Sequence, residues 1–440
     1  MKKYRVSYAA RKFPFLLGVI ALLLWGGTRI LSGIGGFADS SISADGRYLA
    51  FVSYTPNLLS RRVNIFVHDL HTKRTHSIPV APNGVKPDNA HAVYRDTSLS
   101  ADGRFVAFRS YASNLVSDDT NDTDDIFVYD RQTEEITRVS VASDGRENKY
   151  NSFDAKISAN GRYVAFTSFA GTLVAGDANS HSDVFVHDRE TGQTVRVSVS
   201  SEGIAGDGDS AKPSISADGR YIAFVSAAGN LVAKDVNDNE LDVFVHDLFT
   251  GETVLASIVP NEGTKRHNPY GTQVMLSPID YPTISADGRY VVWICGSLLY
   301  INEWQVPHTI EREIQSDEFA FPFTYMAAAG APALSTDGRY MAFTGHANRF
   351  PNKIEKWFIE LIEKKFHIPS YPYSFDFSVS VLVIYDWETG QVESQILNPS
   401  PKDTVIISGD GRYVVYEKEY KVYVYDRQVG KTRRIRGSIF

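Results

Sequence analysis

Residues 41–51 read SISADGRYLAF, and six close copies of this stretch follow along the chain. The Asp-Gly or Asn-Gly pair inside each copy is a strong signal for a hairpin turn, because the central residues of such a turn need positive φ. The apolar run after each pair has the residue types of a buried strand. The Asp or Asn of the turn stands at Asp45, Asp102, Asn160, Asp218, Asp287, Asp337 and Asp410.

Each unit continues with a variable loop, a strand such as DVFVHD at 183–188, a Thr-Gly turn and a strand such as TVRVSV at 194–199. The unit therefore has four strands, and both faces of its strands are apolar, as expected when a sheet lies between two neighbours. Repeats spaced 50 to 73 residues apart indicate a repeat architecture. We predict an all-β fold, a seven-bladed β-propeller of four-stranded antiparallel blades over residues 39–440.

These units resemble the WD-related propeller repeats of the TolB-like family, and the resemblance covers about residues 39–440. It implies the propeller fold. The family includes periplasmic proteins and propellers attached to peptidases, so the resemblance does not decide the function.

Charge and composition limit the partners. The 440 residues are 43% hydrophobic and 12% aromatic, with a formal net charge of -7. The first 38 residues hold six Lys or Arg and no acid, which leaves 39 basic and 52 acidic residues in the remainder. We therefore expect no nucleic-acid partner.

Residues 1–38 are typical of an export segment. Five basic residues lie within 1–12, and an apolar run follows from Phe13 to Trp25. The segment fits either a cleaved signal peptide or an uncleaved anchor in the cytoplasmic membrane. Both alternatives predict a periplasmic or extracellular propeller. The single Cys295 excludes an intramolecular disulfide.

The variable loops between strands two and three leave on the same face as the links between blades, so we expect this face to bind the partner. Loops of blades two, three and four are acidic, with oxygen-bearing side chains at alternating positions, which suits Ca²⁺. The alternative is a set of Asx turns in solvent. The candidate metal ligands are Asp119, Asn121, Asp125, Asp177, Asn179, Asp183, Asp235, Asn237 and Asp242.

Two further patterns concern the blades themselves. Residues 353–366 have the apolar period of an amphipathic helix, which predicts a helical insertion in blade six. The arginine of each turn and the acid that closes the third strand, for example Arg47 and Asp69, are expected to be charge-paired or turn-capping groups between blades. Ring closure is expected to depend on packing between the first and last blades, unless residues 30–38 add an edge strand.

We find no G-x-S-x-G, H-E-x-x-H, P-loop or C-x-x-C pattern, and we predict no catalytic residue. The function that the sequence favours is an exported, non-catalytic binding or scaffolding propeller with a protein or glycan partner, structured by calcium if the acidic loops bind it. The alternative is a hydrolase or lyase acting on a peptide or polysaccharide. Carboxylates converging in the central channel would favour that alternative.

Overall fold

The computed structural model describes residues 37–57, 60–78, 96–169, 171–176, 179–233, 241–257, 279–295, 298–305, 312–314, 323–328, 332–349, 378–386, 388–389, 391–397, 401–418 and 421–435. Within these ranges, no helix is long and apolar enough to cross a membrane. The expected export segment, apart from residues 37 and 38, and the expected helix at 353–366 lie outside the described residues.

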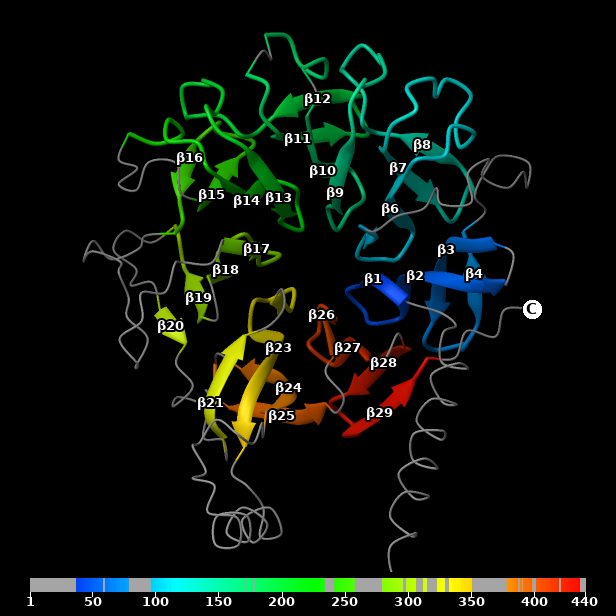
Figure 1. Cartoon of the computed structure of the whole chain (residues 1–440), viewed down its shortest axis with the longest axis vertical. Coiled ribbons are helices and arrows are strands. Elements are labelled where there is room, and N and C mark those ends of the chain that lie inside the picture. The colour runs from blue at the N-terminus through cyan, green and yellow to red at the C-terminus, as the bar shows by residue number, and fades with distance from the viewer. Residues whose placement is uncertain are drawn as a thin grey trace, which may run out of the picture.

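Seven antiparallel sheets follow one another along the chain and form a ring, which confirms the predicted propeller (Figure 1). Blade one contains β1 (Phe37–Ile42), β2 (Tyr48–Asn57), β3 (Ser60–Asp69) and β4 (Thr75–Ser77). Blade two contains β5 (Ser98–Leu99), β6 (Phe105–Ser110), β7 (Asp125–Asp130) and β8 (Ile136–Arg138). Blade three contains β9 (Ser152–Ile157), β10 (Tyr163–Ser168), β11 (Asp183–Asp188) and β12 (Gln193–Arg196). Blade four contains β13 (Ser210–Ile215), β14 (Tyr221–Ser226), β15 (Asp242–Asp247) and β16 (Thr253–Leu255).

The remaining blades follow the same order, with one addition. Blade five contains β17 (Ile279–Ile284), β18 (Val291–Cys295), β19 (Leu298–Asn302) and β20 (Arg312–Ile314). Blade six contains β21 (Phe323–Ala328), β22 (Ala333–Leu334), β23 (Tyr340–Arg349), β24 (Ser378–Asp386) and β25 (Val392–Leu397), and both β21 and β22 pair with β23. Blade seven contains β26 (Pro401–Ile407), β27 (Tyr413–Lys418), β28 (Lys421–Asp426) and β29 (Lys431–Arg434).

The repeated turn is held by its own side chains. In blade one, Ser43 Oγ donates to Asp45 Oδ1 at 2.6 Å and accepts a bond from the Tyr48 N–H at 2.8 Å. Asp45 Oδ1 also accepts from the Arg47 N–H at 2.9 Å. Gly46 takes a φ of 67°, which a residue with a side chain adopts only at a cost. Each fixed residue of the S-x-D-G-R stretch therefore helps to hold the turn.

The glycine of each turn also receives the aromatic ring that follows the arginine in the preceding blade. A Cβ at this glycine would lie 2.1–2.5 Å from a ring atom in six blades and 3.2 Å from one at Gly338. The ring of contacts is complete, since the first blade receives a tyrosine of the last. The pairs are Gly46 with Tyr413, Gly103 with Tyr48, Gly161 with Phe105, Gly219 with Tyr163, Gly288 with Tyr221, Gly338 with Tyr290, and Gly411 with Tyr340.

The turn arginines and the strand-closing acids are charge-paired, as expected, but they do not pair between blades. Each arginine pairs with the acid of its own blade, because the arginine begins the second strand and the acid ends the antiparallel third strand beside it. Tyr48 of β2, for example, lies opposite Asp69 of β3. The pairs are Arg47–Asp69, Arg104–Asp130, Arg162–Asp188, Arg220–Asp247, Arg289–Glu303, Arg339–Asp386 and Arg412–Asp426.

The core lies between the blades. Within a blade, the phenylalanine of the second strand stacks on that of the third, as Phe166 does on Phe185 with ring centroids 5.9 Å apart. The first strands of successive blades contact one another around the axis, and β1 contacts β26. Leu49 and Phe51 of blade one pack in one cluster with Val415 and Val424 of blade seven. Closure by packing between first and last blades is thereby confirmed; β1, the first strand of blade one, begins at Phe37.

Candidate functional site

The connections from the second to the third strand and from each blade to the next leave on the same face, opposite the Asp-Gly turns, because consecutive strands are antiparallel. We call this the variable-loop face. The acidic loop of blade two and the described part of that of blade three lie on it. Of their nine candidate ligands, Asp177, Asp235 and Asn237 lie outside the described residues.

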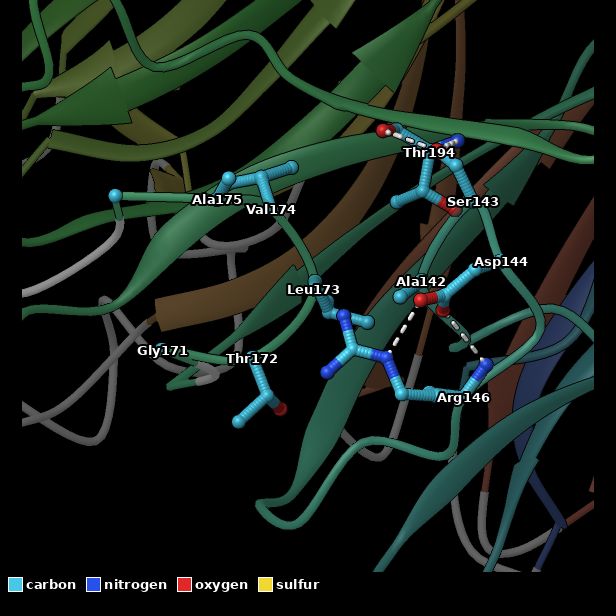
Figure 2. A pocket seen from close by; sticks show the side chains of 11 residues that line it. Ala142, Ser143, Asp144, Arg146, Gly171, Thr172, Leu173, Val174, Ala175 and Thr194 are labelled. Carbon is cyan, nitrogen blue, oxygen red and sulfur yellow. Dashed lines mark hydrogen bonds and ion pairs between the residues drawn. The ribbon is translucent and has the colours of Figure 1, made fainter.

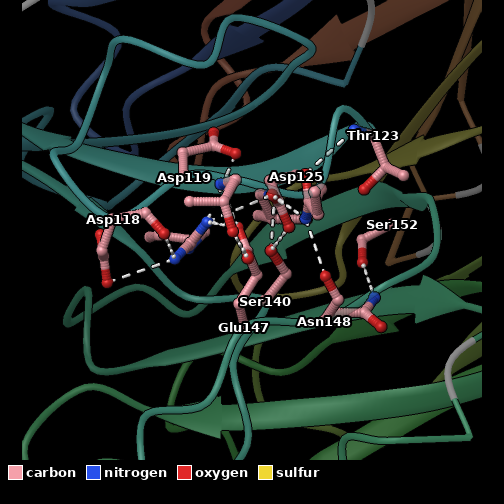
Figure 3. Close-up of polar contacts among 12 residues, drawn as sticks. Asp118, Asp119, Thr123, Asp125, Ser140, Glu147, Asn148 and Ser152 are labelled. Atoms are coloured by element: carbon pink, nitrogen blue, oxygen red, sulfur yellow. Dashed lines mark hydrogen bonds and ion pairs between the residues drawn. The ribbon is translucent and has the colours of Figure 1, made fainter.

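Blade two brings two of its three candidates together. Carboxylate oxygens of Asp119, Asp125 and Glu147 all lie within 4.8 Å of one another, a grouping that could hold a metal ion (Figure 3). Glu147 belongs to the link after β8 and is not among the predicted ligands. Asn121 does not present its oxygen to this group: its Nδ2 donates to Asp125 Oδ2 at 2.8 Å, and its Oδ1 accepts from the Thr123 N–H.

A guanidinium already lies among these carboxylates. Arg138, the last residue of β8, has a side chain that is 3% exposed. Its Nη1 is 2.6 Å from Glu147 Oε1, 3.5 Å from Asp119 Oδ1 and 3.6 Å from Asp125 Oδ2. The arginine thus supplies positive charge where a bound cation would supply it. We call Asp119, Asp125, Arg138 and Glu147 the blade-two cluster.

Three acids share one cation in this cluster; Asp125 is buried, and Asp119 and Glu147 are partly buried. Burial, opposed by the charge of Arg138, raises the pKa of Asp119 to about 6. Burial also raises the pKa of Asp125 to about 6, against hydrogen bonds from Ser140 and Asn121. Burial acts on Glu147 in the same direction, but hydrogen bonds from Thr120 and Arg138 outweigh it and lower the pKa of this carboxyl. The cluster therefore holds a proton more readily than isolated aspartates do.

Blade three repeats part of this arrangement. Arg196 Nη1 lies 3.2 Å from Asp183 Oδ2, and Asn179 Nδ2 donates to the same oxygen at 3.1 Å. Ser198 Oγ donates to Asp183 Oδ1 at 2.5 Å, as Ser140 does to Asp125. The R-x-S pattern on the fourth strand is the signal that would have predicted both arginines.

Blade four differs at one position. Asp242 is buried and accepts a bond from Ser257 Oγ at 2.6 Å, as its counterparts do. Leu255 takes the register position of the arginines, because it lies opposite Phe244 as Arg196 lies opposite Phe185. The arginine is therefore a feature of blades two and three, not of the repeat as a whole.

Beside the blade-two cluster, the variable-loop face has a shallow pocket of about 460 Å³ (Figure 2). Residues 142–146 of the link after β8 form one wall, and residues 171–176 after β10 form the other. Arg146 pairs with Asp144 at 2.6 Å. Two large apolar side chains on this face are exposed, Tyr150 at 51% and Phe169 at 50%. Ile204, at 59%, is exposed in the turn 200–204, whose Ser201 hydroxyl bonds to Thr253 at the start of β16.

A second group of charges lies near the axis. Asp96 and Asp154 occupy the same repeat position at the first strands of blades two and three, and both have positive φ, 79° and 59°. The Asp154 N–H donates to Asp96 Oδ2 at 3.1 Å. Burial and the charge of Asp96 raise the pKa of Asp154. Arg109 lies 3.8 Å from Asp96. The sequence interpretation missed this pair, because a bulge in the first strand carries no motif of its own.

No protein-family model matches the sequence, and no curated protein sequence matches it. Solved structures do resemble the fold. The β-propeller domain of the Trilobed protease from Pyrococcus furiosus is 12% identical, over 92% of this chain and 96% of that one, with a TM-score of 0.51. A puromycin-hydrolyzing peptidase from Mycobacterium tuberculosis is 14% identical, over 91% of this chain and 53% of that one, with a TM-score of 0.51.

TolB from Acinetobacter baumannii is also among the similar structures, with 20% identity over 60% of this chain and a TM-score of 0.36. The match spans about half of that protein's length, 51%. At 12% identity, the match to the Trilobed protease domain supports the β-propeller fold alone.

Proposed function

We propose that this chain is an exported, non-catalytic propeller that binds a protein or glycan partner on the variable-loop face of blades two to four. The supporting observation is the exposure of Tyr150 and Phe169 on that face. Exposed apolar side chains gathered on one face are a feature of binding surfaces. Phe169 also contacts Phe153 of β9, with ring centroids 5.6 Å apart, so its ring is held in place rather than free to turn.

The polar groups beneath this surface support binding rather than catalysis. Asp125 and Asp183 are buried and hydrogen-bonded to serines of the fourth strand, and each lies beside an arginine. Carboxylates held in this way maintain the conformation of the loops. The basic and apolar start of the sequence supports export, with the segment either removed or kept as an anchor.

A screen of the labelled full-length chain against a glycan array and a peptide display library tests this function. We expect hits whose binding is lost in the double variant Tyr150→Ser, Phe169→Ser. The matched control is Phe249→Ser, since Phe249 is 63% exposed on the opposite face. Hits that survive the double variant but are lost with Phe249→Ser would contradict the proposal, as would the absence of any hit.

A catalytic site near the axis is the second candidate, favoured by the Asp96–Asp154 pair. Two carboxylates of which one holds its proton more readily are suited to acid and base roles. The test is cleavage of casein and of polygalacturonate by the full-length chain and by Asp154→Asn. If the parent chain cleaves either substrate and Asp154→Asn does not, the chain is a hydrolase or lyase rather than a binding protein.

Calcium is our candidate for the ion that the blade-two cluster could hold. The three carboxylates offer the hard oxygen ligands that this ion prefers. Because Arg138 lies among them, replacing this arginine tests whether calcium can take the place of its positive charge.

A further inference from the structure

We propose that the pocket at the junction of blades two and three takes a neutral hexose-type unit of a glycan. This inference rests on the proposed function, since it names the partner class for the same region of the molecule. The pocket, of about 460 Å³, has the size of a small-ligand site. Its two walls are the turn 142–146 in the link after β8 and the loop 171–176 after β10.

The charges that line the pocket balance each other. Among the described lining residues, the charged ones are Asp144 and Arg146, whose Oδ2 and Nε lie 2.6 Å apart. The two Nη groups of Arg146 form no hydrogen bond with the described residues. In Figure 2 this guanidinium extends toward Leu173 of the opposite wall. A charged ligand would be attracted by one member of the pair and repelled by the other, so the pair favours a ligand without net charge.

The polar groups of the pocket suit hydroxyls. A sugar hydroxyl both donates and accepts hydrogen bonds, so neighbouring hydroxyls of one hexose can donate to Asp144 and accept from Arg146 at the same time. An apolar ligand would displace water from this pair without replacing its hydrogen bonds. The lining also offers three hydroxyl-bearing side chains and two branched apolar ones for the C–H face of the ring: Ser143, Thr172, Thr194, Leu173 and Val174.

An extended peptide would gain little from the strand edge at this pocket. β12 is the outermost strand of blade three, and its Thr194 lines the pocket. The Thr194 N–H donates to Ser143 Oγ at 2.9 Å, and the same hydroxyl donates to the Thr194 carbonyl at 3.2 Å. Because both backbone groups are already bonded, a peptide cannot pair with this residue as an added strand. These contacts favour a glycan over a peptide as the occupant.

One loop residue distinguishes this junction from the next one. Thr172 and Asn230 are equivalent, since each lies four residues after the end of its second strand, β10 or β14. Asn230 joins its loop to the following link: its Nδ2 donates to the Ala205 carbonyl at 2.8 Å, and its Oδ1 accepts from the Asp207 N–H at 3.1 Å. Thr172 has a shorter side chain, which donates to Asn148 Oδ1 at 3.4 Å. The loop and the link are therefore less tightly joined at the pocket.

Asn148 connects the pocket with the exposed aromatic side chains. It is fully buried, and its Nδ2 donates to the Tyr150 carbonyl at 2.7 Å and to Ser168 Oγ at 2.9 Å. Phe169 follows Ser168 directly in the sequence. A longer glycan can therefore extend from the pocket onto Tyr150 and Phe169, whose rings offer flat apolar surface to the C–H faces of further sugar units.

An array of neutral and acidic oligosaccharides tests the proposal, followed by titration calorimetry of the best neutral hit with the full-length chain. We expect neutral hits whose affinity is the same at low and at high salt, because no net charge is involved. Thr172→Asn and Arg146→Ile introduce the residues that the next junction has at these positions, Asn230 and Ile204. Each should weaken binding about tenfold, the first by closing the pocket and the second by removing hydrogen bonds from the guanidinium.

The matched control is Glu202→Ala, because Glu202 follows Ser201 in the next link as Asp144 follows Ser143. We expect it to bind as the parent chain does, and thermal midpoints close to that of the parent would show that all three variants are folded. An equal loss of binding in the control would mean that the pocket is not the site. Hits on acidic glycans alone, with binding that weakens as salt rises, would overturn the assignment to a neutral sugar.

Two further outcomes separate this inference from the proposed function. Glycan binding that is lost in the double variant Tyr150→Ser, Phe169→Ser but kept in both pocket variants would leave the proposed function in place and exclude the pocket. Peptide hits without glycan hits would do the same and assign a protein partner. The absence of any hit would overturn both.

Discussion

At the scale of the residue, the glycine of each Asp-Gly turn both adopts a positive φ and leaves room for an aromatic ring of the preceding blade. Substitutions can separate these two requirements. Gly219 has a φ of 80°, and a Cβ there would lie 2.1 Å from the Tyr163 ring of the preceding blade. Gly192 has a φ of 74° but nothing within 4 Å of that position. We expect Gly192→Ala to cost about 1 kcal/mol, from the left-handed backbone alone. Gly219→Ala should cost about 2 kcal/mol more, because it also overpacks the junction between blades.

Chemical denaturation of both variants measures this difference directly. Equal losses of unfolding free energy would mean that the turn conformation, not the contact with the aromatic ring, accounts for the glycine.

Arg138 allows the second test at this scale. Removing one partner from a buried charge cluster leaves the others uncompensated, so Arg138→Leu should lower the unfolding free energy by about 3–5 kcal/mol. Leucine is the residue that blade four has at this position. If the guanidinium stands where a cation would bind, millimolar CaCl₂ should raise the thermal midpoint of Arg138→Leu much more than that of the parent chain.

MgCl₂ serves as the control for charge alone, and EDTA gives the ion-free midpoint. A calcium-specific rise of the same size in the parent chain would instead show that the cluster holds the ion and the Arg138 guanidinium at the same time. If CaCl₂ raises the thermal midpoint of neither protein, the proposal that this cluster binds calcium is wrong.

At the scale of the element, the fold was predictable because the information is local and repeated. The turn Ser43-x-Asp45-Gly46-Arg47 satisfies its own hydrogen bonds, so seven copies define seven hairpins without knowledge of the rest. The candidate site was not predictable from the sequence, because the arginine that balances its acidic charge comes from another element. Asp119 and Asp125 are close in sequence, whereas Arg138 and Glu147 reach them from β8 and the link beyond it.

The fourth strand of blade three is tied to the link from the preceding blade by two hydroxyls, those of Ser143 and Thr194. Thr194 Oγ1 of β12 donates to the Val141 carbonyl at 2.5 Å and lies 2.8 Å from His187 Nδ1. Burial lowers the pKa of His187 to about 4, so the ring is neutral at pH 7. Thr194→Val should cost about 1–3 kcal/mol, since it leaves these two groups unsatisfied. Thr194→Ser keeps the hydroxyl, and we expect it to retain most of the stability in the same denaturation experiment.

At the scale of the whole molecule, two sets of carboxyl groups change the unfolding free energy in opposite directions as pH changes. The hydrogen bond from Arg162 lowers the pKa of Asp188 to about 2, and the other Arg–Asp pairs shift their acids in the same direction. Their stabilisation is present above the usual aspartate pKa of about 4 and is lost as pH falls through 2. In the blade-two cluster the pKa values of Asp119 and Asp125 are raised to about 6. Their stabilisation is present below pH 4 and is lost as pH rises through 6.

Three buried histidines act in the opposite direction between pH 7 and pH 5, because burial lowers the pKa of His68 and lowers those of His187 and His246 to about 4. The effect of the cluster is therefore measured as the difference between the parent chain and Asp119→Asn, which removes one of the raised groups. We expect the unfolding free energy of the parent chain, relative to that of Asp119→Asn, to be higher at pH 5 than at pH 7, and that of both proteins to fall below pH 4. A difference between the two proteins that stays the same from pH 5 to pH 7 would contradict the charge balance inferred for the cluster.

The ring itself has one junction that the chain does not cross. Blades one to seven are joined in sequence by their links, but blade seven meets blade one through side chains such as Val424, which is fully buried beside Leu49. Val164 is equally buried between blades two and three, where a link restrains the separation of the blades. Val→Ala removes similar volume at both places, at about 2 kcal/mol each.

Hydrogen exchange should distinguish the two variants, because opening at the uncrossed junction exposes both end blades at once. We expect Val424→Ala to speed exchange throughout β1–β4 and β26–β29, whereas Val164→Ala speeds it only near the substituted side chain. Equal and local effects of the two substitutions would mean that packing alone closes the ring as firmly as a covalent link does.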